Sequence, residues 1–445
     1  MRKQKYSKLK KVRDVSFLAV YSASRLRPYF PIFSIEEYMQ FVSLQECAQN
    51  PSCLNIWGRT GYTEDGNIRL NPLTLFWTAS GIECAVTETE LYADIECDYK
   101  YYRPWISVWI NGKRVRRLAP EKGRTRLLLW DSAASNTTAI REKAVEPAAE
   151  SAEQGKIVYI RILKECQAMA GDSAHRFCIH GFCTNSGKAV PDIFMPLAPK
   201  KYLFECIGDS ITCGEGLEDS VPGKAWNSAW QGTRNHFALI LSQRFNADIS
   251  IIAQSGWGLL CGWNNDPHCT IPPLYPFVCS LAKGAANREA GAPETWDFSR
   301  HKTDAVIINL GSNDEYAFRA APWEDPASRK TYKLHGDADY ARLKTAAKNF
   351  IGEIRRRNPE ALIIWCYGMF LTGCMDLFRS AVEEFRAENR DDKVRFIELS
   401  PMDDTTAGAQ KHPGHLCHKE AADLLTAVLL KKGFKQTPKI GAPLF

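Results

Sequence analysis

The sequence predicts an all-β sandwich of the jelly-roll type, followed by a three-layer α/β domain with a parallel sheet. Three observations support this fold class. At 445 residues the chain exceeds the usual size of a single core. Short runs of alternating apolar and polar residues fill the part before about residue 200. After that point apolar strands alternate with amphipathic helices, so we expect a sandwich over 51–198 and the α/β domain over 199–445.

The first 50 residues are expected to form a basic extension that precedes both domains. The chain has a formal net charge of +6, but seven of its Lys and Arg residues lie between Arg2 and Arg13. Without those seven, 50 basic residues face 51 acidic ones, so the folded part is close to neutral. A short basic terminus is usually a solvated tail. We therefore expect neither nucleic acid nor a membrane as a partner.

The cysteines and the lengths of the apolar runs indicate the cellular compartment in which the protein is expected. The 15 cysteines are odd in number and scattered, several of them inside expected strands, which favours reduced thiols over a disulfide framework. No apolar run is long enough to cross a bilayer, and residues 15–23 make only a short, weak signal-peptide core. The sequence therefore predicts a cytoplasmic protein. It leaves the oligomeric state open, a homo-oligomer included.

The expected strands of the sandwich are short and rich in β-branched and aromatic residues. Asn111-Gly112 separates two of them, and this dipeptide favours the tight turn of a β-hairpin. The strands are expected at 73–80, 90–97, 105–110, 113–118, 125–130, 156–163 and 176–182.

The expected strands after residue 200 are almost continuously apolar, which indicates burial on both faces and hence a parallel sheet. They cover 202–208, 249–255, 304–311, 361–368 and 394–399. Amphipathic helices are expected at 236–245, 340–357, 377–389 and 418–433. Ligands bind such sheets beyond the carboxyl ends of the strands, so the residues that end the strands are the candidates for a site.

Four clusters of polar residues and glycines follow the strands or precede the last helix. Ser210 follows the first strand, Gly256 the second and Asn313 the third, and His412 lies shortly before the last helix. Because the carboxyl ends of parallel strands meet at one edge of a sheet, we expect these four residues to converge.

These residue types suit acyl transfer by a serine nucleophile. A serine on a tight turn between a strand and a helix is exposed near a helix N-terminus, where backbone N–H groups favour negative charge. Histidine ordinarily titrates near neutral pH, so His412 can take the proton of Ser210. The N–H groups of Ser210 and Gly256 and the side-chain amide of Asn313 form the expected oxyanion hole.

The blocks GDSITCGEG, SGWG, GSND and HPGHLCH resemble those of the SGNH (GDSL-like) hydrolases, in which Ser, Gly, Asn and His come from four such blocks. Over 55–430 the chain also resembles the second carbohydrate esterase family, for example in IWGRTGY and LFWTASGIECAV. That resemblance implies a β-sandwich fused to an SGNH domain. It also implies removal of acetyl groups from plant polysaccharides such as xylan and mannan. We expect no cofactor.

The sequence departs from this resemblance at the acid of the catalytic triad. Relatives of this type often have Asp two residues before the histidine, and SGNH enzymes in general have it three before, but here those positions hold Gln410 and Ala409. Some members of the family manage with a Ser-His dyad, in which a backbone carbonyl orients the imidazole. Asp403 and Asp404 are nearby candidates for an acid, although each also suits a solvated loop.

Tryptophans near the serine and glycine blocks are candidates for binding sugar rings. Trp257 has the best claim because it adjoins Gly256, and Trp263 is the second candidate. Trp226 and Trp230 suit packing equally well.

Two groups of histidines and cysteines resemble metal-ligand spacings, within 175–183 and 412–418. Strand alternation puts His175 and Cys178 on opposite faces, and Pro413-Gly414 makes the second group a loop that enters a helix. We therefore expect no metal site.

The sequence as a whole predicts a serine esterase that acts on acetylated oligo- or polysaccharides. Two alternatives remain open. One is an SGNH esterase or thioesterase with another acyl substrate, because this fold hosts many acyl groups. The other is a non-catalytic carbohydrate-binding protein, given the absent acid and the sandwich domain.

Overall fold

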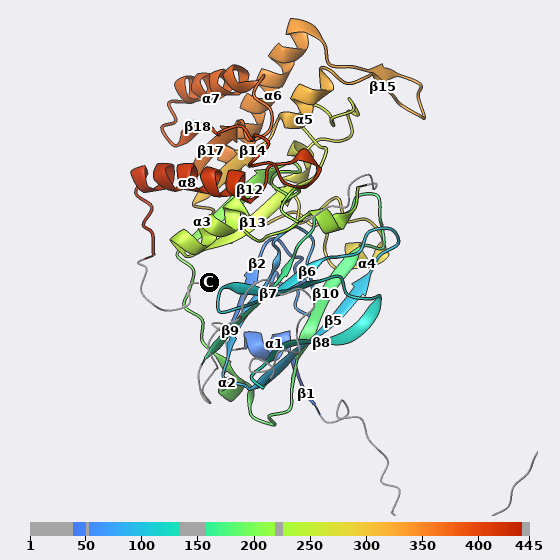
Figure 1. Ribbon diagram of the computed structural model, residues 1–445, viewed down its shortest axis with the longest axis vertical. Helices are drawn as coiled ribbons and strands as arrows, with labels where there is room; N and C mark the ends of the chain where they lie inside the picture. Colours follow the sequence, from blue (N-terminus) through green and yellow to red (C-terminus); the bar gives the residue numbers. More distant parts are fainter. Residues whose placement is uncertain (1–38, 50–52, 134–156, 219–225, 438–445) are drawn as a thin grey trace, which may run out of the picture. The chain divides into compact units, whose positions relative to one another are not determined.

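A computed structural model describes residues 39–49, 53–133, 157–218 and 226–437, which belong to one compact unit (Figure 1). The basic segment between Arg2 and Arg13 lies outside the described residues. Within the described part, no helix has the length and apolarity needed to cross a membrane.

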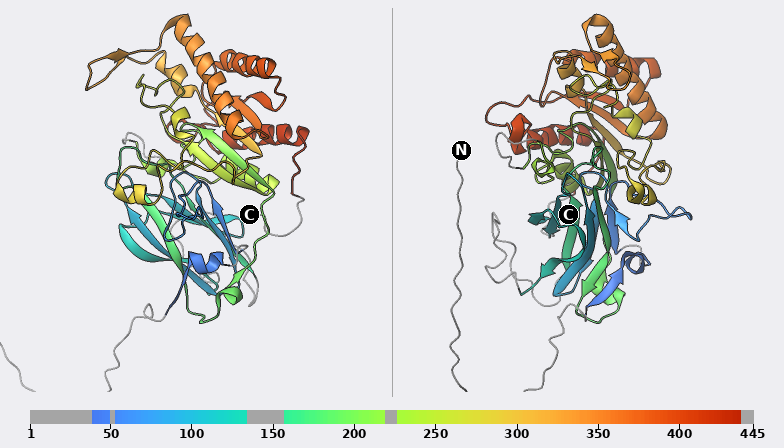
Figure 2. Two further views of the ribbon diagram at one scale, coloured as in Figure 1. Left: turned by 180° about the vertical axis from the view of Figure 1, so that it is seen from behind. Right: turned by 90° about the vertical axis from the view of Figure 1, so that its right-hand side faces the viewer.

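The N-terminal half is a sandwich of antiparallel strands, as predicted (Figure 2). One sheet has the order β1–β10–β5–β8, with β3 paired to β10, and the other has the order β11–β4–β9–β6–β7, with β2 paired to β4. The first sheet consists of β1 (Gln40–Ser43), β3 (Leu73–Thr74), β5 (Glu90–Asp98), β8 (Gly123–Asp131) and β10 (Arg176–Thr184). The second consists of β2 (Leu54–Trp57), β4 (Gly81–Val86), β6 (Ile106–Ile110), β7 (Lys113–Leu118), β9 (Val158–Lys164) and β11 (Phe194–Met195).

The predicted hairpin at Asn111-Gly112 is confirmed. These two residues connect β6 to β7, and Ile110 pairs with Lys113 across the turn. Their φ angles of +48° and +77° are both positive, as a type I′ turn requires.

The sandwich begins earlier than expected. Residues 40–48, expected in the extension, form β1 and the helix α1 (Leu44–Ala48). Gln40 of β1 pairs with Thr184 of β10, and Leu44 and Cys47 are fully buried in the core of the sandwich. The expected start at residue 51 therefore moves back to residue 40. At the other end, β11 ends at Met195 and the next strand begins at Tyr202.

The C-terminal half contains a five-stranded parallel sheet of order β13–β12–β14–β17–β18. In its register, Gly208 at the end of β12 pairs with Ala253 of β13 on one side and with Asn309 of β14 on the other. The carboxyl ends of these three strands therefore lie side by side. The sheet consists of β12 (Tyr202–Gly208), β13 (Ala247–Ala253), β14 (Ala305–Asn309), β17 (Leu362–Tyr367) and β18 (Val394–Glu398).

Two pairs of helices cover the two faces of this sheet and make the three predicted layers (Figure 1). Leu241 of α3 (Phe237–Phe245) and Leu425 of α8 (His415–Lys431) share one core cluster. Phe350 of α6 (Gly336–Arg357) and Phe378 of α7 (Met375–Asn389) share the other. The remaining short elements are α2 (Val190–Ile193), η3 (Ser228–Trp230), η4 (Pro272–Leu274), α4 (Ala285–Glu289), α5 (Ser312–Ala317), the β15 (Trp323–Glu324) and β16 (Thr331–Tyr332) hairpin, and η5 (Ala409–Lys411).

A buried ion pair joins the sandwich to the parallel sheet. Arg59, which follows β2, places Nη2 2.8 Å from Oε1 of Glu205 in β12, and both side chains are almost completely buried. Asn55 of β2 also donates a hydrogen bond of 2.6 Å to Oδ1 of Asp248 in β13. An unpaired buried charge is costly, so a packing of the two halves that separated Arg59 from Glu205 would be disfavoured.

Candidate active site

Ser210 lies in the turn that follows β12, at the carboxyl edge of the parallel sheet. Gly208 allows the backbone at the start of this turn to lie close to Thr212 and Asn309. A Cβ at Gly208 would lie 2.2 Å from Oγ1 of Thr212 and 2.3 Å from the carbonyl oxygen of Asn309. Since neither distance leaves room for a carbon atom, a larger residue would displace the turn that carries Ser210.

The chain after Ser210 makes a single helical turn, and the expected helix is absent there. Backbone hydrogen bonds join the N–H of Cys213 to the carbonyl of Asp209 at 2.9 Å and the N–H of Gly214 to the carbonyl of Ile211 at 3.0 Å. Gly214 has φ of +80°, which a helix does not continue. No helix N-terminus therefore lies at Ser210, and the expectation that a helix dipole stabilises charge there is wrong.

Asp209 lies buried beside Ser210, where its carboxyl is harder to ionise than an exposed one. Its side chain is fully buried, and Oδ2 has no hydrogen-bond partner among the described residues. Burial raises the pKa of the Asp209 carboxyl to about 7, and the charges of Asp314 and Glu215 add to the shift. The carboxyl is therefore only partly ionised near neutral pH.

His412 contacts Ser210 directly. Its Nε2 lies 2.9 Å from Oγ of Ser210, and its Nδ1 lies 3.2 Å from the carbonyl oxygen of Gln410. Because a carbonyl oxygen can only accept a hydrogen bond, Nδ1 carries the proton and Nε2 accepts the hydrogen bond of the serine hydroxyl. The imidazole stacks on Phe370, with ring centroids 5.7 Å apart and an interplanar angle of 6°. This tautomer is the one that a general base needs.

Two residues in the left-handed region direct the Gln410 carbonyl toward the imidazole. Gln410 and Lys411 have φ angles of +54° and +57°, which residues other than glycine rarely adopt. Each such conformation costs about 1–3 kcal/mol and persists where the surroundings hold it. Here the N–H of Gly408 donates to the carbonyl of His412 at 2.7 Å, and the N–H of Ala409 donates to that of Gly216 at 3.2 Å. The loop thus supplies a backbone partner to His412 where an acid was missing.

The two aspartates considered as acids make other contacts. Oδ1 of Asp403 accepts hydrogen bonds from the N–H groups of Thr405 at 2.8 Å and Thr406 at 3.0 Å, and from the Thr405 hydroxyl at 2.7 Å. The Thr405 hydroxyl is the main cause that lowers the pKa of Asp403. Asp404 is exposed. In the described part of the chain, no contact joins either carboxylate to His412.

Gly256 and Asn313 lie close together at the same edge of the sheet. Nδ2 of Asn313, in α5, donates a hydrogen bond of 2.9 Å to the carbonyl of Trp257. Gly256 has φ of +80°, a conformation that favours glycine. With the register of β12, β13 and β14, this bond brings the expected oxyanion donors to the edge that carries Ser210. Their role in holding an oxyanion stays a prediction.

The two candidate tryptophans differ in exposure. Trp257 is partly buried and packs against the core, whereas Trp263 is 52% exposed. A Cβ at Gly256 would lie 3.1 Å from Cδ1 of Trp263, so the exposed ring lies beside the expected oxyanion hole. Trp263 and Trp323 also line a surface hollow of about 310 Å³. Trp263 therefore has the better position for a sugar ring. Of the other two tryptophans, Trp230 is buried, whereas Trp226 is partly buried and lies edge-on to Tyr102.

The sequence reasoning missed Glu215. Its Oε1 lies 3.8 Å from Nδ1 of His412, and its Oε2 accepts a hydrogen bond of 2.7 Å from the hydroxyl of Ser255. The available signal was an acid inside the GDSITCGEG block, where the other residues are mostly small or apolar. Within the described residues, no group of three His, Cys, Asp or Glu side chains is arranged to hold a metal ion.

Comparisons with known proteins agree with this architecture. The GDSL-like Lipase/Acylhydrolase family matches residues 206–415. An acetyl xylan esterase from the rumen bacterium Butyrivibrio proteoclasticus has 30% sequence identity and a TM-score of 0.78, over 88% of this chain and 98% of that one. The cellulase/esterase CelE of Acetivibrio thermocellus is 32% identical over 258 residues, 57% of this chain and 28% of that protein. An acetylxylan esterase/glucomannan deacetylase of Cellvibrio japonicus is 25% identical over 238 residues, 53% of this chain and 58% of that protein. The chain therefore spans less than two thirds of the length of these two curated relatives.

Proposed function

This chain belongs to the SGNH (GDSL-like) hydrolases and resembles the family two carbohydrate esterases, and from that premise we propose that it removes O-acetyl groups from plant polysaccharides or their oligosaccharides, such as xylan and mannan. The observation that carries the proposal is the 2.9 Å contact between Oγ of Ser210 and Nε2 of His412 at the carboxyl edge of the sheet. The named activities of the relatives from Butyrivibrio proteoclasticus and Cellvibrio japonicus support the acetyl ester as substrate.

In the proposed mechanism His412 acts first as base and then as acid. Nε2 of His412 takes the hydroxyl proton of Ser210 while Oγ attacks the carbonyl carbon of the acetyl ester. The negative charge that forms on the carbonyl oxygen is held by the N–H groups of Ser210 and Gly256 and by the Asn313 amide. The bond to the sugar oxygen then breaks, and that oxygen takes the proton from His412.

Water completes the reaction by the same steps. His412 takes a proton from the water molecule, whose oxygen attacks the acetyl-Ser210 carbonyl. When this second intermediate collapses, acetate leaves and the proton returns to Oγ of Ser210. The Gln410 carbonyl holds the imidazole in one orientation throughout, because Nδ1 keeps its proton.

The surroundings of the nucleophile support a carbohydrate as the alcohol part of the ester. The exposed face of Trp263 and the hollow that it lines with Trp323 offer apolar surface of the kind on which sugar rings stack. Tyr316, which is 45% exposed, lies edge-on to Trp263 with ring centroids 6.0 Å apart.

A panel of esters tests this proposal. The purified protein is incubated with acetylated xylo- and manno-oligosaccharides and with aryl esters of acetate, butyrate and a long-chain acid, and the products are measured by mass spectrometry. We expect acetate release from the oligosaccharides and little turnover of the long-chain ester. Faster turnover of the long-chain ester than of every acetylated sugar would point instead to another acyl substrate.

A non-catalytic carbohydrate-binding role is the other alternative. The missing acid at positions 409 and 410 is the observation in its favour. A serine-directed organophosphonate separates the two, because it reacts with an activated serine and leaves a mere binding site unmodified. We expect stoichiometric labelling of the wild-type protein and none of Ser210→Ala.

A further inference from the structure

Glu215 is a buried acid next to His412 that the mechanism above does not use. Its side chain is 5% exposed, and its Oε1 lies 3.8 Å from Nδ1 of His412. Among the described residues, His412 is the one group able to take a positive charge that lies within 4.0 Å of the Glu215 carboxylate, at 3.8 Å. A buried carboxylate is costly without a partner, and an imidazolium at His412 would be such a partner.

We propose that Glu215 is a positioning residue for His412 and supplies the electrostatic effect of the acid missing at positions 409 and 410. The proposal rests on the esterase function proposed above. When Ser210 gives up its proton, the imidazole becomes an imidazolium, and a carboxylate at 3.8 Å stabilises that charge.

Two groups thereby share the task of one triad aspartate. The Gln410 carbonyl, at 3.2 Å from Nδ1, accepts the hydrogen bond that orients the ring. Glu215 is too distant for that bond, but it carries the full charge that a carbonyl lacks. The orientation of the His412 ring and the stabilisation of its positive charge therefore both have a source, although the aspartate is missing.

A chain of hydrogen bonds fixes the carboxylate in place. Oε2 of Glu215 can only accept, so the Ser255 hydroxyl donates to it at 2.7 Å. The oxygen of that hydroxyl in turn accepts a hydrogen bond of 3.0 Å from Nε2 of Gln231. Nε2 of Gln231 also donates to Oε1 of Gln167 at 2.8 Å. Each hydrogen bond in this series has one possible donor and one possible acceptor, so the series specifies a single arrangement of these side chains.

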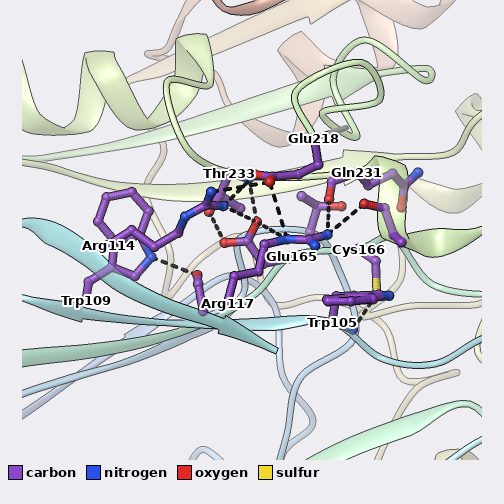
Figure 3. A network of polar contacts seen from close by, with 12 residues as sticks. Trp105, Trp109, Arg114, Arg117, Glu165, Cys166, Glu218, Gln231 and Thr233 are labelled. Atoms are coloured by element: carbon purple, nitrogen blue, oxygen red, sulfur yellow. Dashed lines mark hydrogen bonds and ion pairs between the residues drawn. The ribbon is translucent and has the colours of Figure 1, made fainter. Parts of the chain in front are cut away.

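The sandwich half supplies the far end of this chain. Gln167 follows β9, and its Oε1 also accepts the backbone N–H of Ser255 at 2.8 Å. Glu165, two residues earlier, accepts hydrogen bonds from the N–H of Thr233 at 2.8 Å and from its hydroxyl at 2.6 Å. Figure 3 shows Gln231 and Thr233 beside Glu165 in this network. The sandwich thus helps to hold the carboxylate that faces His412.

The test compares three variants of the full chain with the wild type on a small aryl acetate. Glu215→Gln keeps the size and the acceptor for Ser255 but removes the charge, whereas Glu215→Asp keeps the charge. Glu218→Gln is the matched control, because Glu218 lies in the same segment but pairs with Arg114. We measure kcat, KM, the rate of organophosphonate inactivation and unfolding in urea.

We expect Glu215→Gln to lower kcat and the inactivation rate by about 10²-fold, with KM within about twofold of the wild type. The figure lies below the loss of about 10⁴ for a neutralised triad aspartate, because the carbonyl still orients the ring. Glu215→Asp should be at least about tenfold more active than Glu215→Gln, and Glu218→Gln should match the wild type within about twofold. A purely structural role would lower the stability of both Glu215 variants without restoring kcat in Glu215→Asp.

Wild-type kcat in Glu215→Gln, or equal kcat in the two Glu215 variants, would overturn the proposal. Ser255→Ala provides a second test should Glu215→Gln fail to fold. This substitution leaves the charge of Glu215 but removes the hydroxyl that donates a hydrogen bond to it. We expect kcat to fall about tenfold at constant KM. An unchanged kcat would contradict the inference. Failure of the proposed function would show separately, as turnover of the aryl acetate without acetate release from acetylated oligosaccharides.

Discussion

Gly216 packs against the histidine loop so closely that one added methyl group should impair catalysis. A Cβ at Gly216 would lie 2.8 Å from Cβ of His412 and 2.9 Å from the carbonyl oxygen of Pro413. Carbon atoms in van der Waals contact are about 3.5–4.0 Å apart, so Gly216→Ala requires a shift of roughly 1 Å in the loop that carries His412. A misplacement of about 1 Å in a catalytic group can cost about 10²-fold in rate. We therefore expect kcat to fall about 10²-fold.

Backbone strain contributes separately to the effect on stability. Gly216 has φ of +98°, and an alanine in that region costs about 1–3 kcal/mol in the free energy of unfolding. Gly433 is the matched control, because its φ of +90° is similar and a Cβ there would meet nothing within 4 Å. Gly433→Ala should lose similar stability from strain but keep the kcat of the wild type.

The assay is the hydrolysis of an aryl acetate together with unfolding in urea, for the wild type and both variants. Retention of kcat within twofold in Gly216→Ala would refute the reasoning that His412 is held in place by this contact. Equal loss of kcat in Gly433→Ala would show that lowered stability alone explains the effect.

Three further predictions concern the other groups of the site. Asn313→Ala should lower kcat by roughly 10²–10³-fold, the usual effect of losing one oxyanion donor, whereas a change mainly in KM would mark Asn313 as a sugar-binding residue. Asp403→Asn and Asp404→Asn should each lower kcat less than about tenfold, because neither carboxylate contacts His412 among the described residues; a loss of about 10³-fold in either would identify it as a triad acid. Burial raises the pKa of Asp209 to about 7, above its unfolded value near 3.8, so the free energy of unfolding should fall by about 4 kcal/mol as the pH rises from about 4 to 7. Asp209→Asn should remove that part of the pH dependence in urea unfolding, and an unchanged profile would contradict the shift.

Much of the fold could be predicted because its signals are local. The Asn111-Gly112 turn needs two positive φ angles, which these two residues tolerate well. Strands buried on both faces leave continuous apolar runs, as in β14 and β17. Since parallel strands end at one edge, placing the blocks around Ser210 and Asn313 on strand ends sufficed to bring them together.

The rest depends on contacts between distant segments. The strand β1 has four residues with mixed burial, and it is recognisable only by its pairing with β10. Glu215 meets His412 because the loop around Gly408 folds back onto Gly216, a contact that no local pattern encodes. Trp263 is a second example. Its exposed ring lies beside Gly256 because the loop between them folds back, which the spacing of the two residues in the sequence does not indicate.

The central claim is that Ser210 carries the acetyl group during turnover, and trapping of the acyl-enzyme tests it most directly. The protein is mixed with an acetylated xylo-oligosaccharide, quenched in acid within milliseconds, digested and analysed by mass spectrometry. We expect one acetyl group on the peptide that contains Ser210. In Ser210→Ala we expect neither that adduct nor more than about 10⁻⁴ of the wild-type kcat. An acetyl group on another residue, or undiminished turnover by Ser210→Ala, would contradict it.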